Sequence, residues 1–381
     1  MIRKVFAHNF RSIRALTLEL NGFECLVGPN NSGKSNLFDV FSFLADATRF
    51  GVPRALASRE PQKVRYYAAP ESEPTILEVA IDLPASLGYS RAEYTIGFRG
   101  DPVVIDREIL NAFAEPGKAT TLFSYQRDAK GMGSFMRRGA GEGQVGPINE
   151  LASRTHGITG DAAPIWEYLR GYMSQFRKYR FVPDLLKHEG QATRADELAS
   201  DGRNFASYLL TIHSGHRGHF GRIEEQLRKS FPNVEELVTP MSPTHDGFTE
   251  VGIKEKWFRK IASGAQLSDG LAGFIAYLAV LYGPEEPTLA IFEEPENHIH
   301  PRLMEKLVEM LRGASRDQQV LLSTHSVPLI NRLSLKELVL VERGTDGGTT
   351  ARRVKEEAEL EAALRDWALG EAYASGVLDA A

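Results

Sequence analysis

The eight residues Gly28–Ser35 constrain this chain more than any other feature, because they fit the pattern Gly-x-x-x-x-Gly-Lys-Ser at every fixed position. The apolar segment 23–27 precedes them, and residues 34–50 carry apolar side chains at helical spacing. A strand, a glycine-rich turn and a helix in this order predict a phosphate-binding loop, in which backbone N–H groups and the helix N-terminus face phosphate oxygens. A chance glycine-rich turn is the alternative, and the flanking strand and helix argue against it.

Two side chains of this loop have expected roles. Lys34 would reach the β- and γ-phosphates of a nucleotide, and the Ser35 hydroxyl would bind Mg²⁺. Further candidate nucleotide ligands belong to the loop and the first turn of the helix: Asn30, Asn31, Ser32, Gly33 and Asn36.

A second feature is an apolar strand, residues 288–292, that ends in Glu293 and Glu294. Buried carboxylates are costly unless they are paired or bound to a metal. We therefore expect Glu293 to hold the water ligands of Mg²⁺ and Glu294 to orient or deprotonate an attacking water. A solvated strand end is the alternative.

Two weaker elements carry groups that suit anions. Ser268 and Gly270 stand where the apolar helix 268–282 begins, which is an anion site or, alternatively, a plain N-cap at Ser268. His325 follows the apolar strand 319–323 and could donate to a γ-phosphate, or could be a hydrogen-bonded histidine at a strand end.

These elements occur together with several others in a fixed order: Asn9-Phe10-Arg11-Ser12, Ser200-Asp201-Gly202-Arg203-Asn204, Leu267-Ser268-Asp269-Gly270, Glu293-Glu294-Pro295-Glu296-Asn297, His300-Pro301 and Ser323-Thr324-His325-Ser326. In this order the chain resembles ATP-binding-cassette ATPases of the RecF/SMC-like branch. It resembles more closely the stand-alone bacterial AAA-type ATPases of that branch, which are OLD-like ATPases without a Toprim domain.

The resemblance implies ATP and Mg²⁺ as cofactors and a slow ATPase. It also implies a head-to-tail homodimer around two ATP molecules, in which the Gly28–Ser35 loop of one chain faces Ser268 and Gly270 of the other. Arg11 matches a position near the phosphates, and Asn297 matches one that touches the opposing subunit. The signature reads Leu-Ser-Asp-Gly and the first acid is Glu293, which leaves the hydrolysis rate open. Gln62 and Gln126 are the candidates for the Mg²⁺-contacting glutamine.

The predicted fold class is α/β, a P-loop NTPase head with a mixed sheet and a helical lobe. The expected parts are an ATP-binding lobe over residues 1–160 and 285–345, a helical lobe with the signature over 161–284, and a terminal hairpin and helix over 346–381. Residues 130–147, rich in glycine, predict a mobile loop. Paired strands are expected at 75–83 and 91–98, helices over most of 162–232 and at 301–313, and a charged helix at 355–372.

Composition limits the partners. The net charge of −5 excludes a global basic field, although a local basic patch that binds DNA stays open. A single cysteine and a charged N-terminal segment favour the cytoplasm, and the uncharged stretch 270–284 is too short to cross a membrane. Residues 36–266 contain no heptad repeat, so no long coiled coil is expected, and residues 326–381 contain no Asp-x-Asp pair of a Toprim nuclease.

The sequence therefore predicts an ATPase head that controls a partner in DNA metabolism or antiviral defence, with a separate nuclease supplied if DNA is cut. A nucleotide-gated scaffold and a DNA-structure sensor with little turnover are the alternatives. The histidines at 213, 216 and 219 have metal-like spacing, but a solvated loop is favoured. The basic and aromatic residues of 170–181 suit nucleic acid, and the amphipathic outer face of a helix is the favoured alternative.

Overall fold

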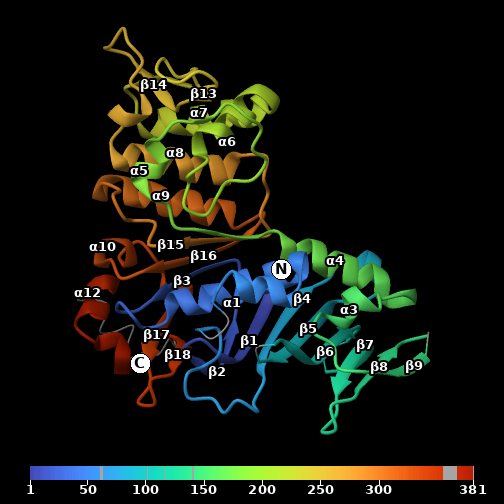
Figure 1. The fold of residues 1–381 in the computed structure, drawn as a ribbon. Coiled ribbons are helices and arrows are strands. Elements are labelled where there is room, and N and C mark those ends of the chain that lie inside the picture. The colour runs from blue at the N-terminus through green and yellow to red at the C-terminus, as the bar shows by residue number, and fades with distance from the viewer. Residues whose placement is uncertain (61–62, 101, 116, 140, 355–366, 381) are drawn as a thin grey trace. The chain divides into compact units, whose positions relative to one another are not determined.

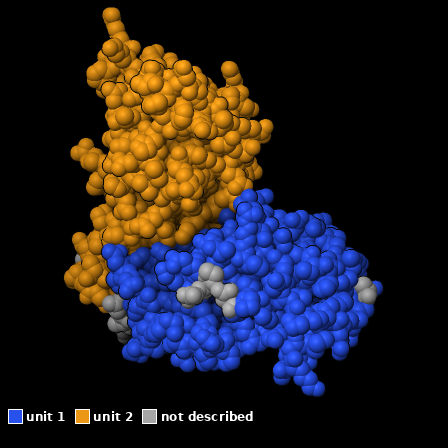
Figure 2. Space-filling view, in the orientation of Figure 1, with its two compact units in different colours: residues 1–176, 338–354 blue, residues 177–337, 355–381 orange. Residues whose placement is uncertain are grey.

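The structure is a computed structural model, and it describes residues 1–60, 63–100, 102–115, 117–139, 141–354 and 367–380. Two compact units make up the chain (Figure 2). Unit 1 comprises residues 1–176 and 338–354, and unit 2 comprises residues 177–337 and 355–381. Helices and strands in both units confirm the α/β fold class. The boundaries expected for the ATP-binding and helical lobes stay predictions.

The larger sheet of unit 1 has eight strands in the order β2-β1-β4-β5-β6-β7-β8-β9, and neighbouring strands pair antiparallel (Figure 1). Its strands are β1 (Ile2–Phe10), β2 (Ile13–Glu19), β4 (Thr75–Asp82), β5 (Arg91–Arg99), β6 (Val104–Phe113), β7 (Ala119–Arg127), β8 (Gly133–Arg137) and β9 (Gly141–Val145). Leu16 and Leu18, two positions apart on β2, are buried on one face of this strand, while Thr17 between them is exposed. The strands expected at 75–83 and 91–98 are confirmed as the neighbours β4 and β5.

The prediction of a mobile loop over residues 130–147 is wrong. β8 and β9 form a hairpin there, with Gly133 opposite Val145 and Arg137 opposite Gly141. The glycines that suggested mobility serve packing instead. A Cβ on Gly133 would lie 2.3 Å from the ring of Tyr125, and a Cβ on Gly143 would lie 2.6 Å from the ring of Phe135. Aromatic side chains from the neighbouring strands therefore lie directly on these glycines.

A second group of strands in unit 1 positions the candidate site. β3 (Phe23–Val27) pairs parallel with β17 (Leu338–Arg343), which pairs antiparallel with β18 (Thr349–Arg353). This confirms the hairpin expected near the end of the chain. The long helix α1 (Lys34–Phe50) follows β3, and Phe43 on it packs against Phe10 and Phe98, with ring centroids 5.7 and 5.1 Å away. The other helices of unit 1 are α2 (Val52–Ala57), α3 (Ala152–Thr155) and α4 (Ala163–Ser174).

Unit 2 contains most of the helices (Figure 1). They are α5 (Pro183–Lys187), α6 (Phe205–Gly215), α7 (Arg217–Ser230), α8 (Asp269–Tyr282), α9 (Pro301–Ala314), α10 (Val327–Ile330) and α12 (Leu369–Ala374). These confirm the helices expected within 162–232, at 268–282 and at 301–313. None of the described helices is long and apolar enough to cross a membrane. Of the helix expected at 355–372, residues 355–366 lie outside the described residues.

Unit 2 contains two parallel strands that pair with each other, β15 (Leu289–Glu293) and β16 (Gln319–Thr324), with Glu293 opposite Ser323. Every residue of both strands is buried, which explains the apolar runs 289–292 and 320–322 within them. The ring of Phe292 lies 5.5 Å from those of Tyr179 and Tyr277. Tyr179 ends the short strand β10 (Phe176–Tyr179), and two small sheets pair β11 (Gly190–Gln191) with β13 (Phe248–Thr249) and β12 (Val234–Val238) with β14 (Gly252–Glu255).

Candidate nucleotide-binding site

The Gly28–Ser35 loop turns directly from β3 into α1. Asn31 and Gly33 have positive φ values of 66° and 107°, which folds the loop back over the start of the helix. Gly33 occupies the N-cap position, where it offers no side chain to accept from the first N–H groups of α1. The first turn of α1, which is fully described, carries no acidic residue. The positive end of the helix dipole therefore has no negative side chain against it in this turn, which suits an external anion.

The side chains of the loop fit a phosphate and a metal ion. The Lys34 ammonium donates to the carbonyl oxygens of Gly28 and Pro29 at 2.6 and 3.0 Å, which holds its charge inside the loop. The Ser35 side chain is exposed, as are Asn30 and Asn31. The buried Ser32 hydroxyl has no hydrogen-bond partner among the described residues. A buried polar atom without a partner is costly, and a phosphate oxygen would satisfy it.

Residues distant in sequence support the back of this loop. Ser12 and Thr349 share a hydrogen bond of 2.6 Å between their hydroxyl groups, although they lie 337 positions apart. The Thr349 hydroxyl also donates to the Ser32 carbonyl at 3.2 Å, and the Asn36 amide donates to the Ser12 hydroxyl at 2.6 Å. Asn36 is therefore engaged in the wall of the loop. Ser12 stood in the resemblance without a role, and Thr349 carried no sequence signal at all.

The hairpin of β17 and β18 also fixes the turn itself. Arg343 donates to the carbonyl oxygens of Asn31 and Gly347, at 2.8 and 2.7 Å. A Cβ on Gly28 would lie 2.1 Å from the carbonyl oxygen of Val341, so only glycine fits beside this strand. Arg343 was missed in the sequence because nothing near it in the chain connects it with the loop.

The family resemblance implies that Arg11 lies near the phosphates, but in this structure the side chain of Arg11 is paired within the protein. Its φ is 50°, and its Nε donates to the carboxylate of Asp39 at 2.5 Å. Asp39, on α1, also accepts from Nε of Arg59 at 3.0 Å. A contact of Arg11 with phosphate stays a prediction, and it requires this ion pair to open. Of the two glutamine candidates, Gln126 is exposed on β7 and Gln62 lies outside the described residues.

In unit 2, the paired acids stand at the carboxyl end of β15. Glu293 is buried, and its Oε1 has no hydrogen-bond partner in the described part of the chain. The ammonium of Lys178 lies 3.8 Å from that oxygen. A buried carboxylate whose ion-pair partner among the described residues lies beyond hydrogen-bonding distance is suited to a metal ion or its water ligands.

Glu294 is held in a strained backbone conformation, with φ at 48°. Its Oε1 lies 3.1 Å from Nδ1 of His325, and its Oε2 accepts from the amide of Asn297 at 3.1 Å. Strain of this kind persists at functional sites where surrounding contacts impose it. The structure thus brings together Glu294 and His325, which the sequence placed on successive strands.

Glu296 supplies a third carboxyl to this arrangement, and sequence reasoning did not assign it a role. Glu296 is buried and accepts from the hydroxyl of Thr324, which in turn accepts from the N–H of Ser326 at 2.9 Å. Burial raises the pKa of Glu296 above its usual value. The pair ties the segment after β15 to the segment after β16 and so holds Glu294 beside His325. The sequence did contain a signal for this pair, because Glu296 and Thr324 both belong to motifs on which the family resemblance rests.

The signature residues lie at the start of α8. The Ser268 hydroxyl accepts from the N–H of Leu271 at 3.3 Å, so Ser268 acts as a helix N-cap in this structure. Asp269 pairs with Lys187 at 2.6 Å and lies 3.6 Å from His298. The hydrogen bond from Lys187 lowers the pKa of Asp269. A Cβ on Gly270 would lie 2.6 Å from the His298 carbonyl oxygen, so this glycine permits close packing.

Residues 23–138 and 159–331 match the family described as AAA domain, putative AbiEii toxin, Type IV TA system. The chain belongs to this family. Its fold is that of a P-loop NTPase.

Similar proteins define the breadth of the relationship. The chain is 21% identical to the Old nuclease of Escherichia phage P2, an alignment that covers 94% of this chain and 62% of that protein. It superposes on an Smc head bound to the C-terminal winged-helix domain of ScpA with a TM-score of 0.58, at 13% identity and covering 94% and 99% of the two chains. An Smc head of Pyrococcus furiosus bound to the C-terminal domain of ScpA gives a TM-score of 0.52, at 12% identity and covering 96% and 98%. These structures share the fold of this member of the AAA family.

The histidine cluster at 213–219 and the basic cluster at 170–181 both form contacts within the protein. His213 lies 2.7 Å from the Thr239 hydroxyl, and His219 lies 2.9 Å from the Tyr282 carbonyl oxygen. Within the described ranges, no three His, Cys, Asp or Glu residues gather as a metal site. Arg177 is paired with Glu285 and Glu197, at 2.5 and 3.0 Å, so this part of the basic cluster is neutralised.

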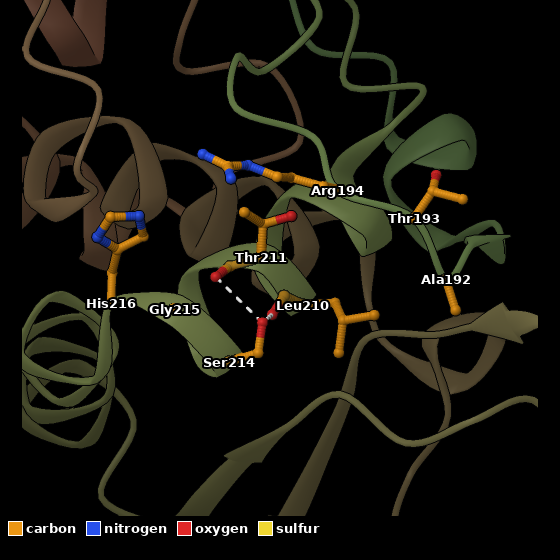
Figure 3. A pocket seen from close by; sticks show the side chains of 8 residues that line it. All are labelled: Ala192, Thr193, Arg194, Leu210, Thr211, Ser214, Gly215 and His216. Atoms are coloured by element: carbon orange, nitrogen blue, oxygen red, sulfur yellow. Dashed lines mark hydrogen bonds between the residues drawn. The ribbon is translucent and has the colours of Figure 1, made fainter.

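A pocket of about 440 Å³ opens elsewhere in unit 2, between residues 192–194 and 210–216 (Figure 3). Hydroxyl groups that line the pocket form hydrogen bonds with the backbone. Ser214 donates to the Leu210 carbonyl at 2.8 Å, and Thr211 accepts from the N–H of Ala195 at 2.9 Å. Arg194 pairs with Asp196. Ser214, Thr211 and Arg194 are therefore engaged within the protein.

Proposed function

We propose that this chain binds ATP with Mg²⁺ at the Gly28–Ser35 loop and hydrolyses it slowly. The observation that carries the proposal is the start of α1, where backbone N–H groups lie beside the Lys34 ammonium with no acidic side chain in the fully described first turn. Anions bind at such helix starts because the N–H groups and the helix dipole act together. The unpartnered Ser32 hydroxyl adds a further donor for phosphate.

Hydrolysis needs a base for the attacking water, and Glu294 is our candidate. Its carboxylate would accept the proton of water, while Asn297 and His325 hold the carboxylate in place. His325 would also donate to the γ-phosphate. Ser35 and Glu293 would hold Mg²⁺, which supplies positive charge to the phosphate oxygens.

The active form in this proposal is a head-to-tail homodimer. Ser268 and Gly270 of one chain would act on the ATP held by the loop of the other, with Arg11 close to the phosphates. Support comes from the position of Ser268 at the exposed start of α8, where N–H groups can receive a phosphate. The dimer would transmit the nucleotide state to an effector, of which a nuclease is our candidate because the relative from phage P2 is named a nuclease. A role in DNA metabolism or antiviral defence follows from this proposal.

The experiment compares two neighbouring acids. Glu294→Gln should retain ATP affinity and accumulate as a dimer, because the base is lost while the metal site remains. Glu293→Gln should weaken binding of Mg²⁺-ATP and should not dimerise. Titration calorimetry gives the affinities and size-exclusion chromatography with ATP gives the oligomeric state. Glu305→Gln, an exposed carboxyl on α9, is the control.

Three results would contradict the proposal. A wild-type chain that releases no phosphate from ATP would remove the ATPase assignment. A Glu294→Gln chain that hydrolyses at the wild-type rate would remove Glu294 as the base. Equal Mg²⁺-ATP affinity in all three variants would remove Glu293 from the metal site.

A further inference from the structure

An exposed loop of unit 2 combines aromatic and basic side chains. It follows β14, projects from the unit (Figure 1), and is closed by two hydrogen bonds between Ile253 and Ala262, of 3.0 and 2.9 Å. Trp257 and Phe258 lie in the middle of this loop and are 77% and 61% exposed. Trp257 is the most exposed large apolar side chain in the part of the chain that the structure describes. We call residues 256–261 the aromatic loop.

The rings of Trp257 and Phe258 are largely exposed to solvent. Within the described ranges, neither ring stacks on another aromatic ring or receives a cation. Exposed aromatic side chains that gather at one place mark binding surfaces, because water contact with so much apolar area is unfavourable. Ile261, which is 45% exposed, extends the same surface.

Cations flank the two rings on both sides. Lys256, Arg259 and Lys260 are exposed, and none of them has an ion-pair partner among the described residues. Lys254, by contrast, is paired with Glu235 and Glu236 at 3.3 Å. The whole chain carries a net charge of −5, so this loop is a local exception that attracts anions.

We propose that the aromatic loop binds single-stranded nucleic acid. Trp257 and Phe258 would stack on bases, and Lys256, Arg259 and Lys260 would contact phosphates. Adjacent flat rings with cations before and after them suit a strand in which bases and phosphates alternate. An acidic protein would use the cations but needs no paired rings. An anionic membrane would gain little from two rings, since stable anchoring takes more buried apolar area.

The test uses the full-length protein without nucleotide, so it does not depend on the proposed ATPase. Binding of a fluorescent oligo-dT is followed by anisotropy at several salt concentrations, and the tryptophan fluorescence of wild type and Trp257→Ala with unlabelled oligo-dT isolates the response of Trp257. We expect log K to fall against log salt with a slope of about −2, from three phosphate contacts at about −0.7 each. Trp257→Ala should lose about 5- to 150-fold in affinity. Lys260→Ala should reduce the slope by about 0.7.

Matched variants separate the loop from general effects. Trp367→Ala removes another half-exposed tryptophan and should leave oligo-dT affinity unchanged. Lys118→Ala removes an exposed cation of unit 1 and should leave the salt slope unchanged. Failure to bind oligo-dT at low salt would overturn the proposal, and so would equal affinities of Trp257→Ala and Trp367→Ala. Binding to phosphatidylserine vesicles that Trp257→Ala abolishes, with no binding of oligo-dT, would assign the loop to a membrane surface instead.

Discussion

Thr349 is the residue whose role depends most on distant contacts. Its hydroxyl meets the Ser12 hydroxyl and the Ser32 carbonyl, and it stands directly behind Gly33. In a loop that must hold several N–H groups toward one anion, such support fixes the binding geometry before the ligand arrives. A phosphate-binding loop is therefore not built by its own eight residues alone.

This support can be tested with one isosteric change. Thr349→Val removes the hydroxyl but keeps the shape, so the loop loses two hydrogen bonds worth about 1 kcal/mol each. We expect ATP to bind about 3- to 30-fold more weakly by titration calorimetry. Thr350→Val, on the exposed face of the same strand, is the control and should bind ATP normally. Equal affinities in the two variants would show that Thr349 does not shape the loop.

At the scale of elements, the hairpin of β8 and β9 shows how glycine can stabilise a sheet. Gly133 and Gly143 leave room for the rings of Tyr125 and Phe135 to approach the neighbouring strand. A glycine-rich segment thus became a pair of strands because aromatic side chains fill the space above it. Composition alone could not distinguish this packing from a mobile loop.

The packing predicts different results for two glycines of this region. Gly133→Ala would bring a Cβ within 2.3 Å of the buried Tyr125 ring, and we expect it to destabilise the protein by about 1–3 kcal/mol. Gly146→Ala meets no atom within 4 Å and should change the free energy of unfolding by less than about 0.5 kcal/mol. Urea unfolding measures both, and hydrogen exchange over residues 133–145 locates the effect. Equal stability of the two variants would contradict this account.

β6 carries a buried carboxyl, and its ionisation should affect stability. Burial raises the pKa of Glu108, which accepts from the Tyr94 hydroxyl at 2.7 Å and from the N–H of Ser153 at 3.0 Å. Because the folded pKa lies above the unfolded value, the contribution to stability is complete at low pH. It is lost as the pH rises through the folded pKa.

We therefore expect wild-type protein to lose stability relative to Glu108→Gln as the pH rises from 5 to 8, because glutamine does not ionise. Urea unfolding at each pH measures the difference. Glu142→Gln, at an exposed position of β9, should show no such trend relative to wild type. A difference between wild type and Glu108→Gln that stays constant over this pH range would contradict the prediction.

At the scale of the whole molecule, the proposed dimer divides each ATP site between two chains. Lys34→Ala should bind ATP poorly, whereas Ser268→Arg should bind ATP but fail to hydrolyse it. In an equal mixture with free exchange, half of the dimers pair the two variants, and each of these has one intact site. Phosphate release should therefore recover to about a quarter of the wild-type rate.

The mixing experiment has two informative failures. No recovery at any ratio would leave the shared site without support. Full activity of Ser268→Arg alone would mean that Ser268 is only the N-cap of α8, which is the role it has in this structure.

The sequence by itself determined the features that depend on neighbours in the chain. The turn from β3 into α1, the buried runs of β15 and β16, and the start of α8 all follow from patterns within a few residues. These patterns predicted the fold class, and they singled out Lys34, Ser35 and the acids after β15 as candidates. Local backbone conformation, period and capping need no knowledge of the rest of the molecule.

Only the tertiary structure decided which distant side chains support the candidate residues. Thr349 and Arg343 behind the Gly28–Ser35 loop, and Thr324 against Glu296, act through contacts between segments far apart in sequence. The strand pairing that brings such segments together is set by the packing of whole layers, so no local pattern specifies it. For the same physical reason the glycines of β8 and β9 led to a wrong prediction of a mobile loop. The rings that pack on Gly133 and Gly143 belong to the neighbouring strands β7 and β8.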